Sequence, residues 1–251
     1  MLSVMNAPHL ITGILATGLF AGTALAQEPV SDTFTTPEGK TLSVTCLKHA
    51  TLLLEYDGLA IHVDPVGKGI PPETDYARQP KADVILVTHE HFDHFDSAAI
   101  AAIVRKDTAL YANPAVCAKL GSGTALRPGD TAALPGGISL AAVPAYNTTP
   151  DHLSFHPKGR DNGYILTLGG LRLYIAGDTE DIPEMSDLRD IDIAFLPCNQ
   201  PYTMTPAQAA RAAHTIHPKV LFPYHCSRSD AALLADALED SGIDVRLRVG
   251  R

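Results

Sequence analysis

Residues 83–96 read Asp-Val-Ile-Leu-Val-Thr-His-Glu-His-Phe-Asp-His-Phe-Asp, and this stretch decides the fold. Its apolar, β-branched run predicts a buried strand. The strand leads into a loop that carries His89, His91, Asp93 and His94. The first two histidines project the same way in an extended segment, whereas the aspartate and the third histidine follow where the chain can turn. Because imidazole and carboxylate groups are ligands for zinc, iron and manganese, the loop predicts a metal site.

Composition sets the broad class of the protein. The chain has 251 residues, of which 45% are hydrophobic and 19% charged, as is typical of a globular protein with a sizeable core. That length accommodates one large domain or two small ones. The formal net charge of −9 argues against nucleic acid as a partner, since phosphates are bound by basic surfaces. It also argues against docking on an anionic membrane surface.

The first 26 residues have the pattern of a secretory signal peptide. An almost uncharged apolar run ends in Ala24-Leu25-Ala26 and is followed by polar residues from Gln27. We therefore expect cleavage after Ala26, a mature domain over residues 27–251, a periplasmic or secreted location and no stable membrane insertion after cleavage. No Lys or Arg precedes the run, which departs from the usual pattern. An uncleaved anchor is the competing interpretation, but the run is short and interrupted by glycines.

The four cysteines do not form a recognisable motif. Cys46, Cys117, Cys198 and Cys226 match neither a zinc ribbon nor a CxxC redox pair. In an oxidising compartment they are either buried free thiols or contribute one disulfide.

Turn residues and apolar periodicity divide the rest of the sequence into strands and helices. The expected strands span 42–47, 51–56, 59–63, 83–87, 108–111, 164–168, 171–176, 191–196, 219–222 and 245–249, with short strands within 124–143. The expected helices span 97–105, 114–120, 205–214 and 230–240. Two β-rich halves, each followed by strand–helix alternation, predict one domain of two layered sheets with outer helices.

Aspartate and histidine recur at the ends of the expected strands. Asp64 ends one strand, Asp178 follows another directly after a glycine, and His225 follows a third. The irregular segment 144–162 adds two more histidines, and a loop of that length inside a compact domain is commonly functional.

These residues occur in the order found in the metallo-β-lactamase superfamily, which the chain resembles from about residue 42 to residue 251. The motifs are Asp64, His89-x-His91-x-Asp93-His94, Gly177-Asp178-Thr179 and His225. The chain is most similar to the branch of small metal-dependent hydrolases that includes ascorbate phosphate lactonase and N-acyl phosphatidylethanolamine phospholipase D. The resemblance implies a hydrolase domain over residues 27–251 with an α/β (α+β) fold, an αββα sandwich of two mixed β-sheets flanked by helices.

The resemblance also implies a role for each motif residue at a centre of two metals. His89 and His91 would bind the first metal; Asp93, His94 and His225 would bind the second; and Asp178 would bridge both. Asp64 would hold a ligand histidine from behind without touching a metal, and an ordinary turn aspartate is the alternative for it.

One further histidine is expected for the first metal, soon after a strand that ends near residue 145. Here the sequence continues Ala145-Tyr146-Asn147, and no histidine follows until His152 and His156. Related members share the phrase around His156, so we favour His156 and keep His152 as the alternative.

The remaining histidines carry no clear chemical signal. His49 and His62 flank the first expected hairpin, where a structural or surface role is at least as probable as a functional one. His214 and His217 lie around a helix end, where a charged imidazole is favourable without any chemistry.

Together these features predict a hydrolase. Two divalent metal ions, zinc first with manganese or iron as alternatives, would share a water and lower its pKa to about 7. The metal-bridged hydroxide would attack a small ester, lactone or amide, while Asp93 orients it and takes its proton. A small molecule is thus the expected partner. The alternatives are a phosphodiesterase of the same fold and a non-catalytic periplasmic metal-binding protein, the latter favoured by the missing histidine at Asn147.

Overall fold

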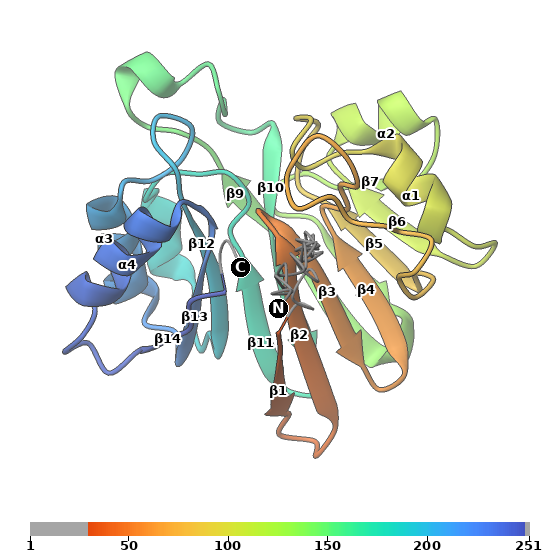
Figure 1. Ribbon diagram of the computed structural model, residues 1–251, viewed down its shortest axis with the longest axis horizontal. Helices are drawn as coiled ribbons and strands as arrows, with labels where there is room; N and C mark the ends of the chain where they lie inside the picture. Colours follow the sequence, from red (N-terminus) through yellow and green to blue (C-terminus); the bar gives the residue numbers. More distant parts are fainter. Residues whose placement is uncertain (1–29, 249–251) are drawn as a thin grey trace, which may run out of the picture.

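The computed structural model describes residues 30–248, so the expected signal peptide over residues 1–26 lies outside the described part of the chain. Two seven-stranded sheets pack face to face, and helices cover both outer surfaces (Figure 1). The predicted αββα sandwich of two mixed sheets is confirmed.

The two sheets repeat one topology. The first contains, in spatial order, β1 (Ser31–Thr35), β2 (Thr41–Lys48), β3 (Thr51–Tyr56), β4 (Leu59–Val63), β5 (Val84–Val87), β6 (Ala109–Ala112) and β7 (Thr124–Ala125). The second contains, also in chain order, β8 (Thr131–Leu134), β9 (Ile138–Ala145), β10 (Asp161–Leu168), β11 (Leu171–Ile175), β12 (Ile193–Cys198), β13 (Val220–Cys226) and β14 (Asp244–Val245). In each sheet the first four strands are antiparallel, and the fourth begins a parallel run.

The helices lie in two groups (Figure 1). Against the first sheet are α1 (Ser97–Ile103) and α2 (Pro114–Leu120); against the second are α3 (Pro206–Ile216), α4 (Arg228–Ala237) and the 3₁₀ turn η3 (Pro183–Asp187). Two further 3₁₀ turns are η1 (Pro135–Gly137) and η2 (Pro150–His152). The predicted capping box is present at Thr205 and Gln208, where α3 begins.

Strand β5 shows why the sequence produces these layers. Val84 and Leu86 point into the core between the sheets, whereas Ile85 and Val87 pack under α1 and α2. Because successive side chains of a strand face opposite sides, a strand covered on both faces must be apolar at every position. Its loop therefore begins from a fully buried and rigid base.

Two elements differ from the sequence-based expectation. Strand β1 was not predicted. It lies at the edge of the first sheet, where it pairs with β2. Phe34 is its only large side chain packed against the core, so the alternation of apolar and polar residues that marks a strand is weak here. The final expected strand, 245–249, is shorter in the structure, where β14 ends at Val245. The irregular segment is confirmed in outline as the loop 146–160 between β9 and β10.

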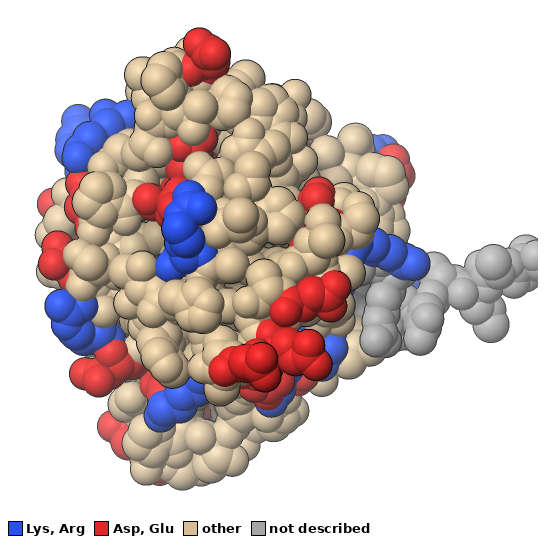
Figure 2. Space-filling model, turned by 90° about the vertical axis from the view of Figure 1, so that its left-hand side faces the viewer, with Lys and Arg blue, Asp and Glu red and all other residues tan. Residues whose placement is uncertain are grey.

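On the face beside α3 and α4, acidic and basic side chains are interspersed (Figure 2). Within residues 30–248, no helix has the length and apolar character needed to cross a bilayer. All four cysteines lie in the described part of the chain and are free thiols.

Candidate metal centre

The candidate ligands meet because the carboxyl ends of parallel strands lie at the same edge of the sheets. Strand β5 leads into residues 89–94, which we call the metal loop, and the neighbouring parallel strand β4 leads into Asp64. In the second sheet, β11 leads towards Asp178, and His225 lies at the end of β13. The loop 146–160 lies at the same edge (Figure 1). It carries His156, which groups with His89 and His91.

A first cluster contains three histidines, namely His89, His91 and His156. His89 Nε2 and His91 Nδ1 lie 3.1 Å apart. The His156 ring centroid lies 4.9 Å from that of His89 and 4.8 Å from that of His91. Three imidazoles are a common ligand set for zinc.

A second cluster contains Asp93, His94, His225 and His49. Asp93 Oδ2 lies 3.4 Å from His225 Nε2, 4.0 Å from His94 Nε2 and 3.1 Å from His49 Nε2. The His49 ring also lies against the ring of His225, with centroids 3.7 Å apart and an angle of 42° between the ring planes. His49 is therefore in contact with Asp93 and His225, two of the three groups expected to hold the second metal.

Asp178 lies between the two clusters. Its Oδ2 atom is 3.4 Å from His156 Nε2 and 3.9 Å from His89 Nε2 in the first cluster, and 3.3 Å from His225 Nε2 in the second. Its Oδ1 atom is 3.2 Å from His94 Nε2. This is the position that a carboxylate shared by two metals occupies.

The spacing of these atoms fits metal coordination better than hydrogen bonding. Ligands about 2.05 Å from a tetrahedral zinc lie about 3.3 Å from one another, which matches the short contacts of both clusters. His94 Nε2, His225 Nε2 and Asp178 Oδ1 are buried and have no hydrogen-bond partner among the described residues, although two of them lie 3.2 Å apart. A buried polar atom without a partner destabilises the folded protein, because it has lost its hydrogen bonds to water. Bound divalent cations would give these atoms partners, so the residues present fit a metal site.

The ring nitrogens that face away from the centre are also held. His94 Nδ1 contacts Asp64 Oδ2 at 2.8 Å, and Asp64 in turn accepts hydrogen bonds from the backbone N–H and hydroxyl of Thr88. His156 Nδ1 lies 3.0 Å from Asp161 Oδ2, and Asn199 Nδ2 lies 3.4 Å from His225 Nδ1. Such contacts fix ring orientation and raise the affinity of histidine for metal.

Asp161 has a second partner, Arg160. The guanidinium donates from Nε to Oδ1 and from Nη2 to Oδ2, both at 2.7 Å, and Nη2 also donates to the Phe155 carbonyl at 2.8 Å. Nη2 lies 3.4 Å from His91 Nε2. Asp161 is fully buried, so this ion pair compensates its charge and ties the loop 146–160 to the metal loop.

The backbone around the site is unusually constrained. His49, Asp64 and His225 have φ values of 43°, 45° and 48°, a region that residues other than glycine seldom occupy. The His225 N–H donates to the His49 carbonyl at 2.9 Å, which locks two of these residues together. Position 177 requires glycine because the backbone of Asn162 lies close to it. A Cβ at this position would lie 2.7 Å from the Asn162 carbonyl oxygen.

Burial and charge set the protonation of the ligands in the metal-free protein. Burial opposes ionisation of Asp178, but the positive charges of His225 and His94 outweigh it and hold the pKa of Asp178 well below its usual value. Burial likewise disfavours a charged His225, yet Asp178 and Asp93 raise the pKa of His225 to about 9. Desolvation lowers the pKa of His89 well below its usual value. His94 and His225 of the second cluster are thus protonated at neutral pH because their pKa values are raised, whereas His89 is a free base.

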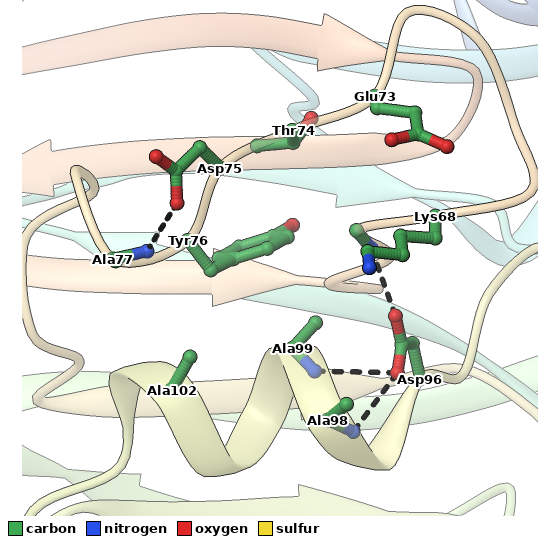
Figure 3. Close-up of a pocket in the computed structure, with 11 residues that line it drawn as sticks. Lys68, Glu73, Thr74, Asp75, Tyr76, Ala77, Asp96, Ala98, Ala99 and Ala102 are labelled. Atoms are coloured by element: carbon green, nitrogen blue, oxygen red, sulfur yellow. Dashed lines mark hydrogen bonds between the residues drawn. The ribbon is translucent and has the colours of Figure 1, made fainter.

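Asp96 anchors the carboxyl end of the metal loop. Its side chain accepts hydrogen bonds from the N–H groups of Ala98 and Ala99, capping α1, and from the Gly67 N–H at 3.0 Å (Figure 3). A cavity of about 540 Å³ lies here between α1 and residues 67–77. Its lining contains none of the clustered histidines, so it is separate from the candidate centre.

The structure places every predicted site residue at this edge, and it places the two late histidines differently. His156 faces Asp178, whereas His152 contacts Glu180 Oε1 at 3.3 Å, away from the cluster. Asn147, where the family has a histidine, donates to the carbonyls of His152 and Tyr202 and so shapes the loop that delivers His156.

Two residues of the site were missed from the sequence. For His49 the sequence left a structural or surface role and a functional one both open, and it was not among the predicted ligands. It contacts Asp93, and its place in the turn between β2 and β3 offered the only local signal. Asp161 was not singled out at all, because it lies within a strand and its contacts depend on the fold of the preceding loop.

Comparison with known proteins agrees with this geometry. The profile of the beta-lactamase superfamily domain matches residues 43–225. The chain belongs to the metallo-β-lactamase superfamily. Within it, the chain falls in the branch of small metal-dependent hydrolases: it is 30% identical over 226 residues to the UPF0173 metal-dependent hydrolase of Archaeoglobus fulgidus, covering 82% of this chain and 94% of that protein.

Solved structures of this superfamily show the same fold. A protein from Parabacteroides distasonis described as a metal-dependent hydrolase is 54% identical, with a TM-score of 0.85 over 89% of this chain and all of that chain. Igni18, a metallo hydrolase from Ignicoccus hospitalis, is 26% identical, with a TM-score of 0.68 over 83% of this chain and 95% of that one.

Proposed function

We propose that this superfamily member hydrolyses a small ester, lactone or amide at a centre of two divalent metals, zinc in the first instance. The observation that carries the proposal is the convergence of two ligand clusters on one carboxylate, Asp178, with buried atoms aimed inward and left unpaired. His89, His91 and His156 would hold one metal, and Asp93, His94 and His225 the other. Such metals lower the pKa of a water and polarise the carbonyl under attack.

The protein's own groups prepare the site for that reaction. Burial raises the pKa of Asp93, but contacts with His225 and His49 outweigh this effect and hold it below its usual range, so the side chain is an anion at neutral pH. An anion at this point orients an attacking water and accepts its proton at a carboxylate oxygen. Asp64 and Asp161 keep the ligand rings aligned.

The test is hydrolysis that depends on Asp93. The metal-loaded mature chain is assayed on a panel of esters, lactones, amides and phosphodiesters, beside the Asp93→Asn variant, with circular dichroism as the folding control. We expect at least about a hundredfold loss of turnover in the variant with folding retained. Activity confined to phosphodiesters would favour a phosphodiesterase instead. No Asp93-dependent activity on any substrate would favour a metal-binding protein without turnover.

Metal content is measured on the same preparation. Two zinc ions per chain by elemental analysis would agree with the proposal, and one ion would contradict the binuclear centre. Loss of activity on chelation and its return with zinc would separate zinc from iron or manganese.

We also propose that the chain is exported and acts on a small molecule in the periplasm or outside the cell. The support is the signal-like pattern of the first 26 residues. Cell fractionation with sequencing of the mature amino terminus tests it; a chain that begins at Gln27 is expected, and an intact amino terminus in the cytoplasm would contradict export.

A further inference from the structure

Exposed apolar side chains lie on the loops that form the candidate centre. Six large hydrophobic side chains are exposed in the described part of the chain, and three of them, Phe92, Leu153 and Tyr202, lie on loops that also carry or contact the ligands. Phe92 lies within the metal loop between His91 and Asp93 and is 73% exposed. Exposed apolar groups that cluster at a site commonly mark a binding surface.

The other two belong to a pair of loops that meet beside the centre. Leu153, which is 47% exposed, lies in the loop 146–160 that delivers His156. Tyr202, which is 46% exposed, follows β12, and its ring packs edge-on against Phe155 with centroids 5.0 Å apart. We call Phe92, Leu153, Phe155 and Tyr202 the apolar rim.

Hydrogen bonds connect this rim to the ligands. The Phe155 carbonyl accepts from Arg160 Nη2, which also lies 3.4 Å from His91 Nε2. The Tyr202 N–H donates to the Asn199 carbonyl at 3.0 Å, and Asn199 Nδ2 lies 3.4 Å from His225 Nδ1. Phe155 is therefore linked to His91 through Arg160, and Tyr202 is linked to His225 through Asn199.

The rim is held in place before any ligand arrives. Glu180 Oε2 accepts four hydrogen bonds of 2.7 to 2.9 Å from the backbone and hydroxyl groups of Thr148 and Thr149. Asn147 Nδ2 donates to the Tyr202 carbonyl at 2.8 Å and joins the two loops. Because this scaffold is already ordered, binding an apolar group here costs little conformational entropy.

We infer that the apolar rim binds the hydrocarbon part of the substrate, so that the substrate is a carboxylic acid derivative with a chain of several carbons. This inference rests on the proposed hydrolysis and names the substrate class for the same centre. The two metals would hold the carboxyl end, and the chain would lie over Tyr202, Phe155 and Leu153. An acidic protein with an apolar rim selects for neutral, apolar acyl groups rather than for polyanions.

Chain length tests the inference. The metal-loaded protein is assayed on 4-nitrophenyl acetate, butyrate and octanoate, all below their critical micelle concentrations. Full burial of one methylene favours binding by about fourfold, and a half-exposed surface by about twofold, so kcat/KM should rise at least about tenfold from acetate to octanoate. A flat profile with the acetate hydrolysed would overturn the inference and leave the proposed function standing.

Three alanine variants and one conservative variant identify the surface. Tyr202→Ala and Leu153→Ala should each reduce the advantage of octanoate severalfold while leaving hydrolysis of the acetate within about twofold of the parent. Leu233→Ala is the matched control, because Leu233 is 56% exposed but lies on α4 at the outer face of the second sheet. Equal losses in all three variants, or no loss in Tyr202→Ala, would overturn the assignment. Thermal melts exclude unfolding, and Tyr202→Phe should retain the full advantage.

A binding measurement separates the two proposals. Octanoate and acetate are titrated into the metal-loaded protein by calorimetry, with and without Tyr202→Ala. Tighter binding of octanoate that depends on Tyr202, in a protein that hydrolyses no ester, would support the rim and overturn hydrolysis. Equal affinity for both carboxylates would overturn the rim whatever the activity.

Discussion

Replacing Asp161 by asparagine should weaken one metal site and spare the other. Both carboxylate oxygens accept from donors: Oδ2 faces His156 Nδ1 and Arg160 Nη2, and Oδ1 faces Arg160 Nε. An asparagine must turn its NH₂ group towards one of these donors, in a position that solvent does not reach. With the NH₂ group at the Oδ2 position, the His156 ring loses its acceptor; with the NH₂ group at the Oδ1 position, the ring keeps an acceptor but loses the negative charge behind it. The second cluster keeps all its contacts in either case.

The magnitude follows from comparable contacts in other metalloproteins. Loss of a carboxylate behind a ligand histidine costs about 10- to 100-fold in metal affinity, or about 1.4 to 2.7 kcal/mol. The assay is stepwise zinc titration of the chelator-stripped protein against a chromogenic chelator. We expect one dissociation constant to rise by that factor and the other to stay within about threefold of the parent.

A matched control separates metal affinity from general stability. Asp32 is also buried and also accepts from arginines, Arg246 and Arg248, but its partners lie on the C-terminal segment away from the metal centre. Asp32→Asn should lower the melting temperature without changing either zinc constant. If Asp161→Asn behaves in the same way as Asp32→Asn, Asp161 has only a structural role and the argument from His156 fails.

Three further predictions concern the same edge. His49→Phe keeps a ring against His225 but loses the contact with Asp93, so kcat should fall about tenfold. His49→Gln should retain most activity. Equal activity in both variants would refute a role for the hydrogen bond between residue 49 and Asp93. Zinc binding at the second cluster must displace protons from His94 and from His225, whose pKa is raised to about 9, so the affinity of that site should fall at least about tenfold per pH unit below pH 9. Calorimetry in buffers of different ionisation enthalpy should show proton release; uptake or no transfer would contradict this. Glu180→Gln should speed amide hydrogen exchange in the loop 146–160, because the Glu180 carboxylate accepts from the N–H groups of Thr148 and Thr149, while the sheet core stays protected. Unchanged exchange would show that Glu180 does not hold the loop.

The sequence by itself determined the layers and most of the candidate ligands. Apolar runs such as that of β5, buried on both faces, predict strands covered on both sides, and the repeated order of elements predicts two sheets. The metal loop was predictable because its four candidate ligands, three histidines and one aspartate, are neighbours in the chain. Asp64, Asp178 and His225 were predictable because each ends a strand, and parallel strands bring such ends together.

Only the tertiary structure decided which distant groups complete the centre. His49 and Asp93 are 44 residues apart, and their contact depends on how the β2–β3 turn lies beside the metal loop. The choice of His156 over His152 depends on the path of the loop 146–160, which has no periodicity and is set by Glu180 and Asn147. Local patterns report which residues share a strand or a turn, whereas contacts across loops are set by packing that no short stretch of sequence encodes.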